Sequence, residues 1–581
     1  MSSQQTDRST PATLLEAPAE AGRRSRPGLD LAAISGLVVI AGIIEFWLRD
    51  LLNRPFFYDE AWRAYDISLG TGFFSHLNES GAPLALGWVA IEDASRLALG
   101  NTEAGLRGPM FLALPVLGIA TYLLARKWLG VAVSFCVAAL LIVNPWTVNN
   151  ALQLKSYSYE GILTVATIAL ILLVERKTWR PVPLLLLYAA LGLTAVFSLP
   201  NLFILGPLLL LDLVRTIRSR DRLWLRIAGE AVAGLIALAH YALFVRPQAE
   251  VASTSFWLSN YAPKQPGPFF HFVIQQLVGF DPLMVTGVAT AENQFPTYTL
   301  PTVAHELLAA GILILLAAGV WAAVRDAAGR VIVVALGGAL LLELIASTVR
   351  RWPFGMTRVS LFLLPLFYVL LGIGAVWLAR AALGRLAGLS RLARRGRLAW
   401  WQVPACAAFL AVLVAILVPG GTATARALME THHMQSRPTE FSYVKAAVAK
   451  ARKRIVPGDL TIVRTDRHQS MWYAEGWLYY MNNYQGYPAS VARLPRIPDS
   501  DSISVYRLTP ASVAAFLTAH PHSPAIYLLE LDAKVAKSLP AFMHKQDLRT
   551  LKQFGYCPVR SSSYPLFGNV VVFTQGACHG T

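Results

Sequence analysis

The feature that most constrains this chain is a series of apolar runs, each close to the roughly 20 residues with which a helix crosses about 30 Å of hydrocarbon. Hydrophobic residues make up 55% of the 581 residues and charged residues only 15%, and the mean hydropathy is +0.48. We therefore expect a polytopic α-helical membrane protein with about eleven spans. The predicted spans are 31–49, 108–126, 130–148, 159–175, 181–199, 200–215, 226–246, 304–324, 331–349, 358–379 and 400–419.

Two segments decide the topology. In residues 81–100 the apolar stretch stops before Glu92 and Asp93, so it is too short to span and its charges would be costly at depth. We expect a helix lying in the membrane interface there. Residues 181–215 are too long for one helix, and "SLPN" at 198–201 offers a turn that splits them.

Charge supports this arrangement. With the N-terminus inside, the segments 126–127, 175–180, 215–226, 325–330 and 380–397 all fall on the cytoplasmic side, and all are basic or mixed-basic, as the positive-inside rule requires. This bias explains the net charge of +17 without nucleic acid as a partner. Residues 1–30 are polar and read as a disordered cytoplasmic tail.

The same topology places several segments outside the cytoplasm. They are the first loop at 50–107, the segments 144–160, 246–305 and 348–358, and everything from 420 to 581. That tail alternates helical and strand patterns, so we predict a small extracytoplasmic α/β domain at 420–581 after a transmembrane domain at 31–419. Cys557 and Cys578 could pair there.

An acidic pair stands out in the first external loop, within "RPFFYDEAWRAYDIS" at 54–68. Asp59 and Glu60 follow Tyr58 and two phenylalanines. An aromatic setting would desolvate a carboxylate, raise its pKa and suit it to act as a general base. The alternative is that the pair only caps the following short helix.

External basic residues form the second candidate set. Lys155, beside Tyr157, and the arginines Arg350, Arg351 and Arg358 oppose the usual charge bias, which favours an anionic partner such as a phosphate. Singly, each could merely extend its charge to the interface. The candidate substrate-binding residues are Tyr58, Arg63, His76, Lys155, Tyr157, Arg350, Arg351 and Arg358, although a plain surface role is the simpler interpretation of His76.

These residues resemble the GT-C glycosyltransferases, and most of all the protein O-mannosyltransferases and lipid A aminoarabinose transferases. "YDEAWRAYDIS" is similar to their first-loop acidic motif, "LQLKSYSYEGILTVATIALILL" to a later K-x-Y segment, and "WPFGMTRVSLFLLPL" to a late P-x-G-x-R segment. The resemblance covers about residues 30–380. It implies a polyprenyl-phosphate-linked sugar donor and inversion at the anomeric carbon. It also implies that Asp59 is the base or acceptor-orienting residue, with Glu60 beside it.

The resulting expectation is a membrane sugar transferase acting on an extracytoplasmic glycan, lipid or protein. No Walker, Rossmann or G-x-S-x-G pattern and no metal-spaced Cys/His set is present. We expect no cofactor and leave the metal requirement open. A lipid-linked-sugar flippase is the alternative, and it would call for ionisable residues at mid-membrane and internal repeats. A receptor with a ligand-binding C-terminal domain is the third reading.

Overall fold

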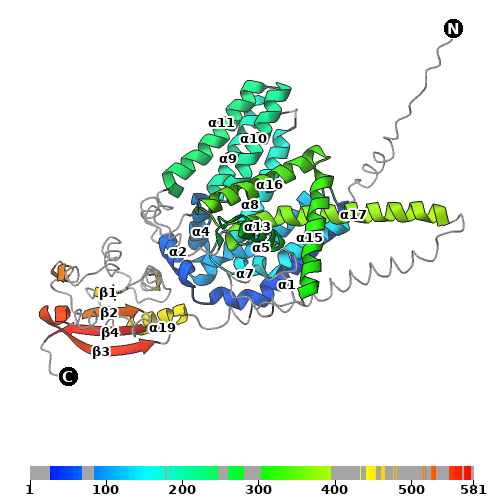
Figure 1. The fold of residues 1–581 in the computed structure, drawn as a ribbon. Helices are drawn as coiled ribbons and strands as arrows, with labels where there is room; N and C mark the ends of the chain where they lie inside the picture. The colour runs from blue at the N-terminus through cyan, green and yellow to red at the C-terminus, as the bar shows by residue number, and fades with distance from the viewer. Residues whose placement is uncertain are drawn as a thin grey trace, which may run out of the picture.

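The structure is a computed structural model, which describes residues 27–68, 84–176, 179–246, 260–280, 302–393, 440–452, 460–464, 525–531, 549–564 and 568–576, with single residues between 429 and 518. Figure 1 shows a helical body and a smaller region with a β-sheet. The helices of the body are α1 (Pro27–Leu48), η1 (Arg49–Asn53), α2 (Tyr58–Ser68), α4 (Leu86–Leu99), α5 (Glu103–Ala125), α6 (Val131–Val143), α7 (Pro145–Ala151), α8 (Tyr157–Val174), α9 (Pro181–Phe197), α10 (Asn201–Ser219), α11 (Leu223–His240), η2 (Tyr241–Val245), α13 (Pro266–Val278), α15 (Thr302–Ala323), α16 (Ala327–Thr348), η4 (Arg358–Leu363) and α17 (Leu364–Ala393).

The helical body is built from long apolar helices. Among the described residues, 7 helices are long and apolar enough to cross a membrane, or up to 8 if the bent pair α6–α7 is one span. The predicted turn at 198–201 is confirmed, because α9 ends at Phe197 and α10 begins at Asn201. The predicted surface segment 81–100 contains α4, a helix of 14 residues. The predicted run 400–419 lies outside the described residues.

The predicted span at 130–148 is a bent pair of helices in the structure. The chain bends by 56° between α6 and α7. Asn144 has extended backbone angles, and its side chain accepts hydrogen bonds from the backbone amides of Trp146 and Thr147. Pro145 then begins α7, where its lack of an N–H costs nothing. An Asn cap followed by Pro therefore starts a new helix inside one apolar run.

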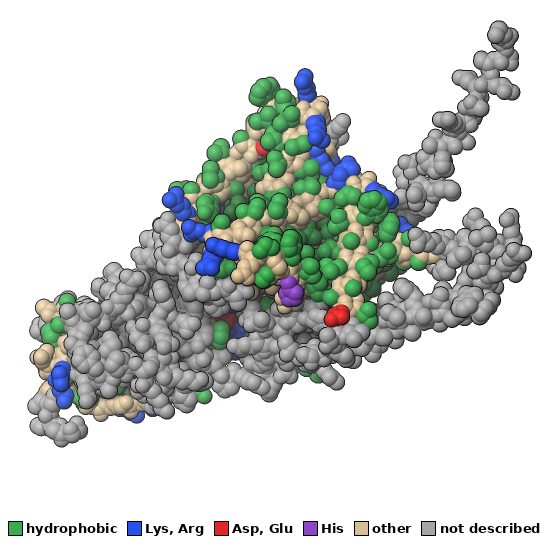
Figure 2. Space-filling model, in the orientation of Figure 1, with side chains coloured by type: hydrophobic (Ala, Val, Ile, Leu, Met, Phe, Trp, Pro, Cys, Tyr) green, Lys and Arg blue, Asp and Glu red, His purple; other side chains and the backbone are tan. Residues whose placement is uncertain are grey.

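The surface of the helical body suits lipid rather than water. Large apolar side chains are exposed on α1, α9 and α11, for example Ile43, Leu186 and Leu235. Figure 2 shows green apolar side chains over the visible face of the helical body, with Lys and Arg mainly at its edges. Inside, small residues let helices approach closely: a Cβ on Gly319 of α15 would lie 2.1 Å from the carbonyl oxygen of Leu370 on α17. These features support a multi-pass membrane protein.

One end of the body joins the loops that the charge rule assigns to the cytoplasm. The indole of Trp128 donates to Asp326 at 2.8 Å, and Arg215 forms an ion pair with Glu175. Arg222 donates to the carbonyl of Trp179. The predicted inner loops thus contact one another.

The opposite end joins segments of the predicted outer face. Arg54 reaches the carbonyl of Leu152, and the amide of Phe354 donates to the carbonyl of Asn260. The amide of Phe56 donates to the hydroxyl of Tyr480. Hence the first loop, the segment after α7 and part of the C-terminal region meet at the same end.

The C-terminal region holds α19 (Glu440–Arg452) and a four-stranded sheet of order β1-β2-β4-β3. Strand β1 (Leu460–Arg464) is parallel to β2 (Ala525–Leu531), whereas β4 (Gly568–Gln575) is antiparallel to both β2 and β3 (Tyr556–Tyr564). The patterns "LTIVR", "AIYLLEL" and "NVVVFTQ" lie on β1, β2 and β4 as predicted. Strand β3 was not predicted, because its Pro and serines hide the alternation of a strand.

Candidate functional site

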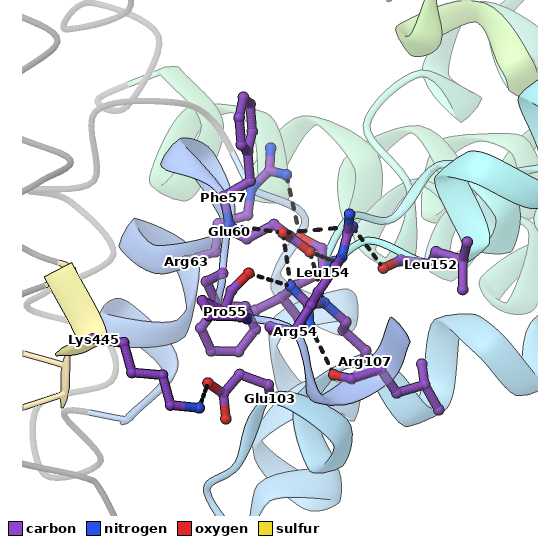
Figure 3. Close-up of polar contacts among 12 residues, drawn as sticks. Arg54, Pro55, Phe57, Glu60, Arg63, Glu103, Arg107, Leu152, Leu154 and Lys445 are labelled. Carbon is purple, nitrogen blue, oxygen red and sulfur yellow. Dashed lines mark hydrogen bonds and ion pairs between the residues drawn. The ribbon is translucent and has the colours of Figure 1, made fainter. Parts of the chain in front are cut away.

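Glu60 is the centre of the polar cluster at this end of the body. Its side chain is fully buried in the first turn of α2 and faces Arg107 of α5, which is also fully buried. The guanidinium binds both carboxylate oxygens, with Nε at 2.9 Å from Oε1 and Nη2 at 2.9 Å from Oε2 (Figure 3). Two parallel hydrogen bonds of this kind are the strongest pairing that arginine offers a carboxylate.

Two backbone amides complete the surroundings of Glu60. The amide of Phe57 donates to Oε2 at 2.9 Å and the amide of Leu154 donates to Oε1 at 2.8 Å. Burial raises the pKa of Glu60, but the charges of Arg107 and Arg54 and the hydrogen bonds from Arg107 and the Phe57 amide lower it more, so the pKa falls from 4.5 to about 2. Each oxygen thus accepts two hydrogen bonds, and the group stays anionic.

Arg107 also shapes the chain that leads into α2. Its Nη1 donates to the carbonyls of Leu52 at 2.8 Å and Arg54 at 2.6 Å, and its Nη2 to that of Pro55 at 3.3 Å. Sequence reasoning missed this residue and treated it as the end of the first loop. The signal was an arginine at the predicted outer end of an apolar run, against the usual charge bias.

The segment Leu152–Ser156, between α7 and α8, is held by three residues of the first loop. Besides the bond from its Leu154 amide to Glu60, it accepts a hydrogen bond from Arg54 Nη2 at the Leu152 carbonyl at 3.2 Å. Arg63 Nη1 donates to the carbonyl of Leu154 at 3.4 Å. All these bonds use main-chain groups, so the loop fixes the path of the segment.

Lys155 stands in the middle of that segment. Its side chain is 2% exposed, and its ammonium lies 5.9 Å from the ring centre of Tyr157, which begins α8. A desolvated ammonium attracts an anion more strongly than one in water does. The first loop and the Leu152–Ser156 segment therefore place Glu60, Arg63, Lys155 and Tyr157 in one region.

The start of α8 packs against the segment that begins with Arg358. A Cβ added to Gly161 of α8 would lie 3.4 Å from Pro365, the second residue of α17, which follows η4. A small cavity of about 10 Å³ lies between these elements and is lined by Leu117, Leu141, Thr147, Tyr157, Ser158, Gly161, Leu361 and Leu364. Arg358, half-buried, opens η4 beside this contact.

The other predicted residues lie elsewhere or beyond the described part. Arg350 and Arg351 are exposed on the turn after α16, where Arg350 has a φ of 57°. Burial raises the pKa of Tyr261, and the positive charge of Arg350 opposes this rise. Tyr58 and Asp59 belong to α2, but their side chains lie outside the described part of the chain, as does His76 entirely. No group of three or more His, Cys, Asp or Glu placed to hold a metal is found among the described residues.

Glu92 is an unusual neighbour of this region. It lies on α4 one turn after Trp88, whose ring faces the guanidinium of Arg63 at 5.8 Å. Glu92 is fully buried, and neither carboxylate oxygen has a hydrogen-bond partner. Burial raises the pKa of Glu92 well above its ordinary value of 4.5. Burial thus favours the neutral form of this carboxyl.

We expect Glu92→Gln to raise the thermal unfolding temperature at pH 8 by about 2–4 °C, the shift that roughly 1 kcal/mol produces in a medium-sized domain. Because folding raises the pKa of Glu92, its contribution to stability is largest below the unfolded pKa of about 4.5. That contribution is lost as the pH rises through the pKa of the folded state. At pH 4 the variant should therefore match wild type. Asp93→Asn, at a partly exposed pair with Arg96, is the control. A lower unfolding temperature for Glu92→Gln at pH 8 would contradict the assignment.

Comparisons with known proteins give structural neighbours only. No protein-family model and no curated protein sequence matches the chain. Among solved structures, the chain is similar to ArnT from Cupriavidus metallidurans in the apo state, at 14% identity over 94% of this chain and 99% of that chain, with a TM-score of 0.49. The same protein bound to undecaprenyl phosphate matches at 15% identity over 96% and 100%, with a TM-score of 0.48.

A second neighbour is the archaeal oligosaccharyltransferase AglB from Archaeoglobus fulgidus, in complex with an inhibitory peptide and a dolichol-phosphate. It matches at 14% identity over 92% of this chain and 74% of that chain, with a TM-score of 0.43. ArnT and AglB are both GT-C glycosyltransferases, the superfamily that the sequence motifs resemble.

Proposed function

We propose that this chain is an integral membrane glycosyltransferase that moves a sugar from a polyprenyl phosphate to an extracytoplasmic acceptor. The observation that carries the proposal is the Leu152–Ser156 segment. Glu60, Arg54 and Arg63 hold its backbone, and Tyr157, which follows the segment, lies beside η4, the element that begins with Arg358. The arginines of the first loop and Lys155 thus lie in the region of Glu60, and Arg358 begins an element that packs on α8.

This arrangement suits the transfer of a sugar from a lipid phosphate. The hydroxyl oxygen of the acceptor attacks the anomeric carbon, and the bond from that carbon to the phosphate oxygen breaks. The electron pair stays on the leaving phosphate, where Lys155, Arg63 and Arg358 stabilise the negative charge. The hydroxyl proton passes to a general base. The lipid tail remains in the membrane, and no nucleotide is needed.

We assign the base to Asp59 and a positioning role to Glu60. The sequence suggested a catalytic role for both carboxylates. Both oxygens of Glu60 already accept two hydrogen bonds each, and its low pKa makes it a poor proton acceptor near neutral pH. Asp59 precedes it at the start of the same helix. The orientation of this end toward the outside is inferred from the charge of the loops.

The flippase alternative requires ionisable groups at mid-membrane. The buried pair of Asp212 with Arg226, 3.1 Å apart, meets that description only in part. Arg226 lies in the first turn of α11 and also donates to the carbonyl of Val174, the last residue of α8. The pair therefore lies near a helix end, where it ties three helices together.

The test is Lys155→Met in the full chain, reconstituted in liposomes with a polyprenyl-phosphate-linked sugar and a pool of hydroxylated acceptors. We expect kcat/KM for transfer to fall by roughly 10- to 100-fold, because the leaving phosphate loses a desolvated cation. Binding of the free polyprenyl phosphate, measured without acceptor, should weaken as well. Lys127→Met, at an exposed lysine of the other end, is the matched control.

Two outcomes would contradict the proposal. In the first, Lys155→Met binds polyprenyl phosphate and transfers sugar as wild type does. In the second, wild-type vesicles move the sugar lipid between leaflets without releasing free polyprenyl phosphate, which would favour the flippase.

A further inference from the structure

The C-terminal region contacts the loop that carries the acidic pair. Lys445 of α19 places its ammonium 2.5 Å from Oε1 of Glu103, the first residue of α5 (Figure 3). Tyr480 is fully buried, and its hydroxyl accepts a hydrogen bond from the amide of Phe56 at 2.9 Å. The same hydroxyl donates to Oε1 of Glu103 at 3.3 Å.

These contacts are connected to Glu60 through neighbouring residues of α5 and of the turn into α2. Glu103 and Arg107 are four residues apart, so they lie on the same side of α5. Phe56 directly precedes Phe57, whose amide donates to Glu60. The guanidinium of Arg107 also lies 4.7 Å from the ring centre of Phe56. Arg107 and Tyr480 therefore hold the turn into α2 from two sides.

The contact is buried, and the hydroxyl of Tyr480 both accepts and donates a hydrogen bond. Burial raises the pKa of the Tyr480 hydroxyl well above its ordinary value of 10, so the hydroxyl keeps the proton that it donates. Its removal would leave the Phe56 amide buried without this acceptor, which is more costly than the loss of an exposed hydrogen bond. The ring also packs edge-on against Tyr479 at 5.2 Å, and Tyr479 in turn against Phe56 at 5.3 Å.

A second contact holds the chain between the two regions. His432 stacks on Trp47 of α1 with ring centres 5.3 Å apart, and its Nε2 lies 3.5 Å from Asp50. The C-terminal region thus contacts the first loop near both ends of η1, at Asp50 and at Phe56.

We propose that Tyr480 and Lys445 are positioning residues through which the C-terminal region fixes the acidic pair for sugar transfer. This inference rests on the proposed function. Tyr480 holds the Phe56 amide and Lys445 holds Glu103, so together they set the start of α2 relative to α5. Asp59 follows Phe56 by three residues and depends on that start for its place.

Tyr480→Phe tests the inference, with Tyr479→Phe as the matched control. Tyr479 donates its hydroxyl to the carbonyl of Asn101 at 3.2 Å, so Tyr479→Phe removes a hydroxyl but leaves the hydrogen bonds of Tyr480 in place. Hydrogen exchange of the peptide that contains Phe56, measured in the full chain without substrate, reports the contact independently of activity. We expect Tyr480→Phe to speed that exchange at least 10-fold and Tyr479→Phe to leave it within 3-fold.

Transfer kinetics then separate positioning from folding. We expect Tyr480→Phe to lower kcat about 10-fold with KM for the sugar lipid unchanged, because the donor site is intact and the base is misplaced. Lys445→Met should act in the same direction, and Lys445→Arg should keep most of the activity. Unchanged exchange in Tyr480→Phe would overturn the contact, and faster exchange with wild-type kcat would overturn the positioning role. A wild-type chain that transfers no sugar would overturn that role together with the proposed function, and the exchange result would still decide the contact.

Discussion

Glu60→Gln is expected to destabilise the folded chain by about 3–5 kcal/mol, the cost of breaking a buried ion pair and leaving its partner charged. The glutamine keeps the shape of the side chain but not its charge. Arg107, fully buried, would then lie in low dielectric without its counter-charge. Thermal or denaturant unfolding of the purified chain in detergent measures the loss.

A double-mutant cycle shows whether the pair acts as a unit. We expect Glu60→Gln with Arg107→Gln to cost at least about 2 kcal/mol less than the sum of the single changes. The difference between wild type and Glu60→Gln should shrink as the pH falls from about 4.5 toward 2. The pKa of Glu60 is lowered on folding, so its contribution is present above the unfolded value and lost on protonation.

The partly exposed pair of Asp93 with Arg96 is the control for this cycle. It is of the same kind but partly open to solvent, so Asp93→Asn should cost less than about 1 kcal/mol. Additive costs at Glu60 and Arg107 would show that the two side chains stabilise the protein separately, against the structure.

Asp59→Asn is expected to lower kcat for sugar transfer by roughly 10²- to 10⁴-fold, the contribution of a general base, while the chain folds and binds polyprenyl phosphate as wild type does. The amide is close in size to the carboxylate but cannot accept the acceptor's proton. Steady-state transfer, binding of polyprenyl phosphate and thermal unfolding should be measured on the same preparation.

Asp93→Asn again serves as the control, since it removes an acidic charge from α4 without touching α2. Transfer by Asp59→Asn within 3-fold of wild type would remove Asp59 as the base. A parallel loss of lipid binding and of folding would instead assign Asp59 a structural role like that of Glu60.

The sequence was most informative where one pattern dominated. Long apolar runs and basic loops predicted the helices of the body, and the strand patterns on β1, β2 and β4 were visible because apolar residues dominate them. The bend at Asn144 escaped prediction, because hydropathy averages over about 20 residues and hides a cap within a run.

The residues of the candidate site were predicted only in part. Lys155 stood out as a cation against the charge bias and Arg63 was among the candidate residues, and the structure brings both to the same segment as Glu60. The partner of Glu60 could not be foreseen, because Arg107 lies 47 positions away and only the packing of α2 on α5 brings them together. The same holds for Tyr480, 424 positions from Phe56.

The hydrogen bonds between the first loop and Leu152–Ser156 have a consequence for how relatives of this protein should be sought. The first loop binds the carbonyl of Leu152 and the amide and carbonyl of Leu154, groups that every residue except proline supplies in full. Apolar residues of similar size could therefore replace both leucines during evolution without loss of the connection. Search profiles based on residue identity would miss such replacements. A proline at position 154 would lack the amide that donates to Glu60, so it would indicate a relative without this connection.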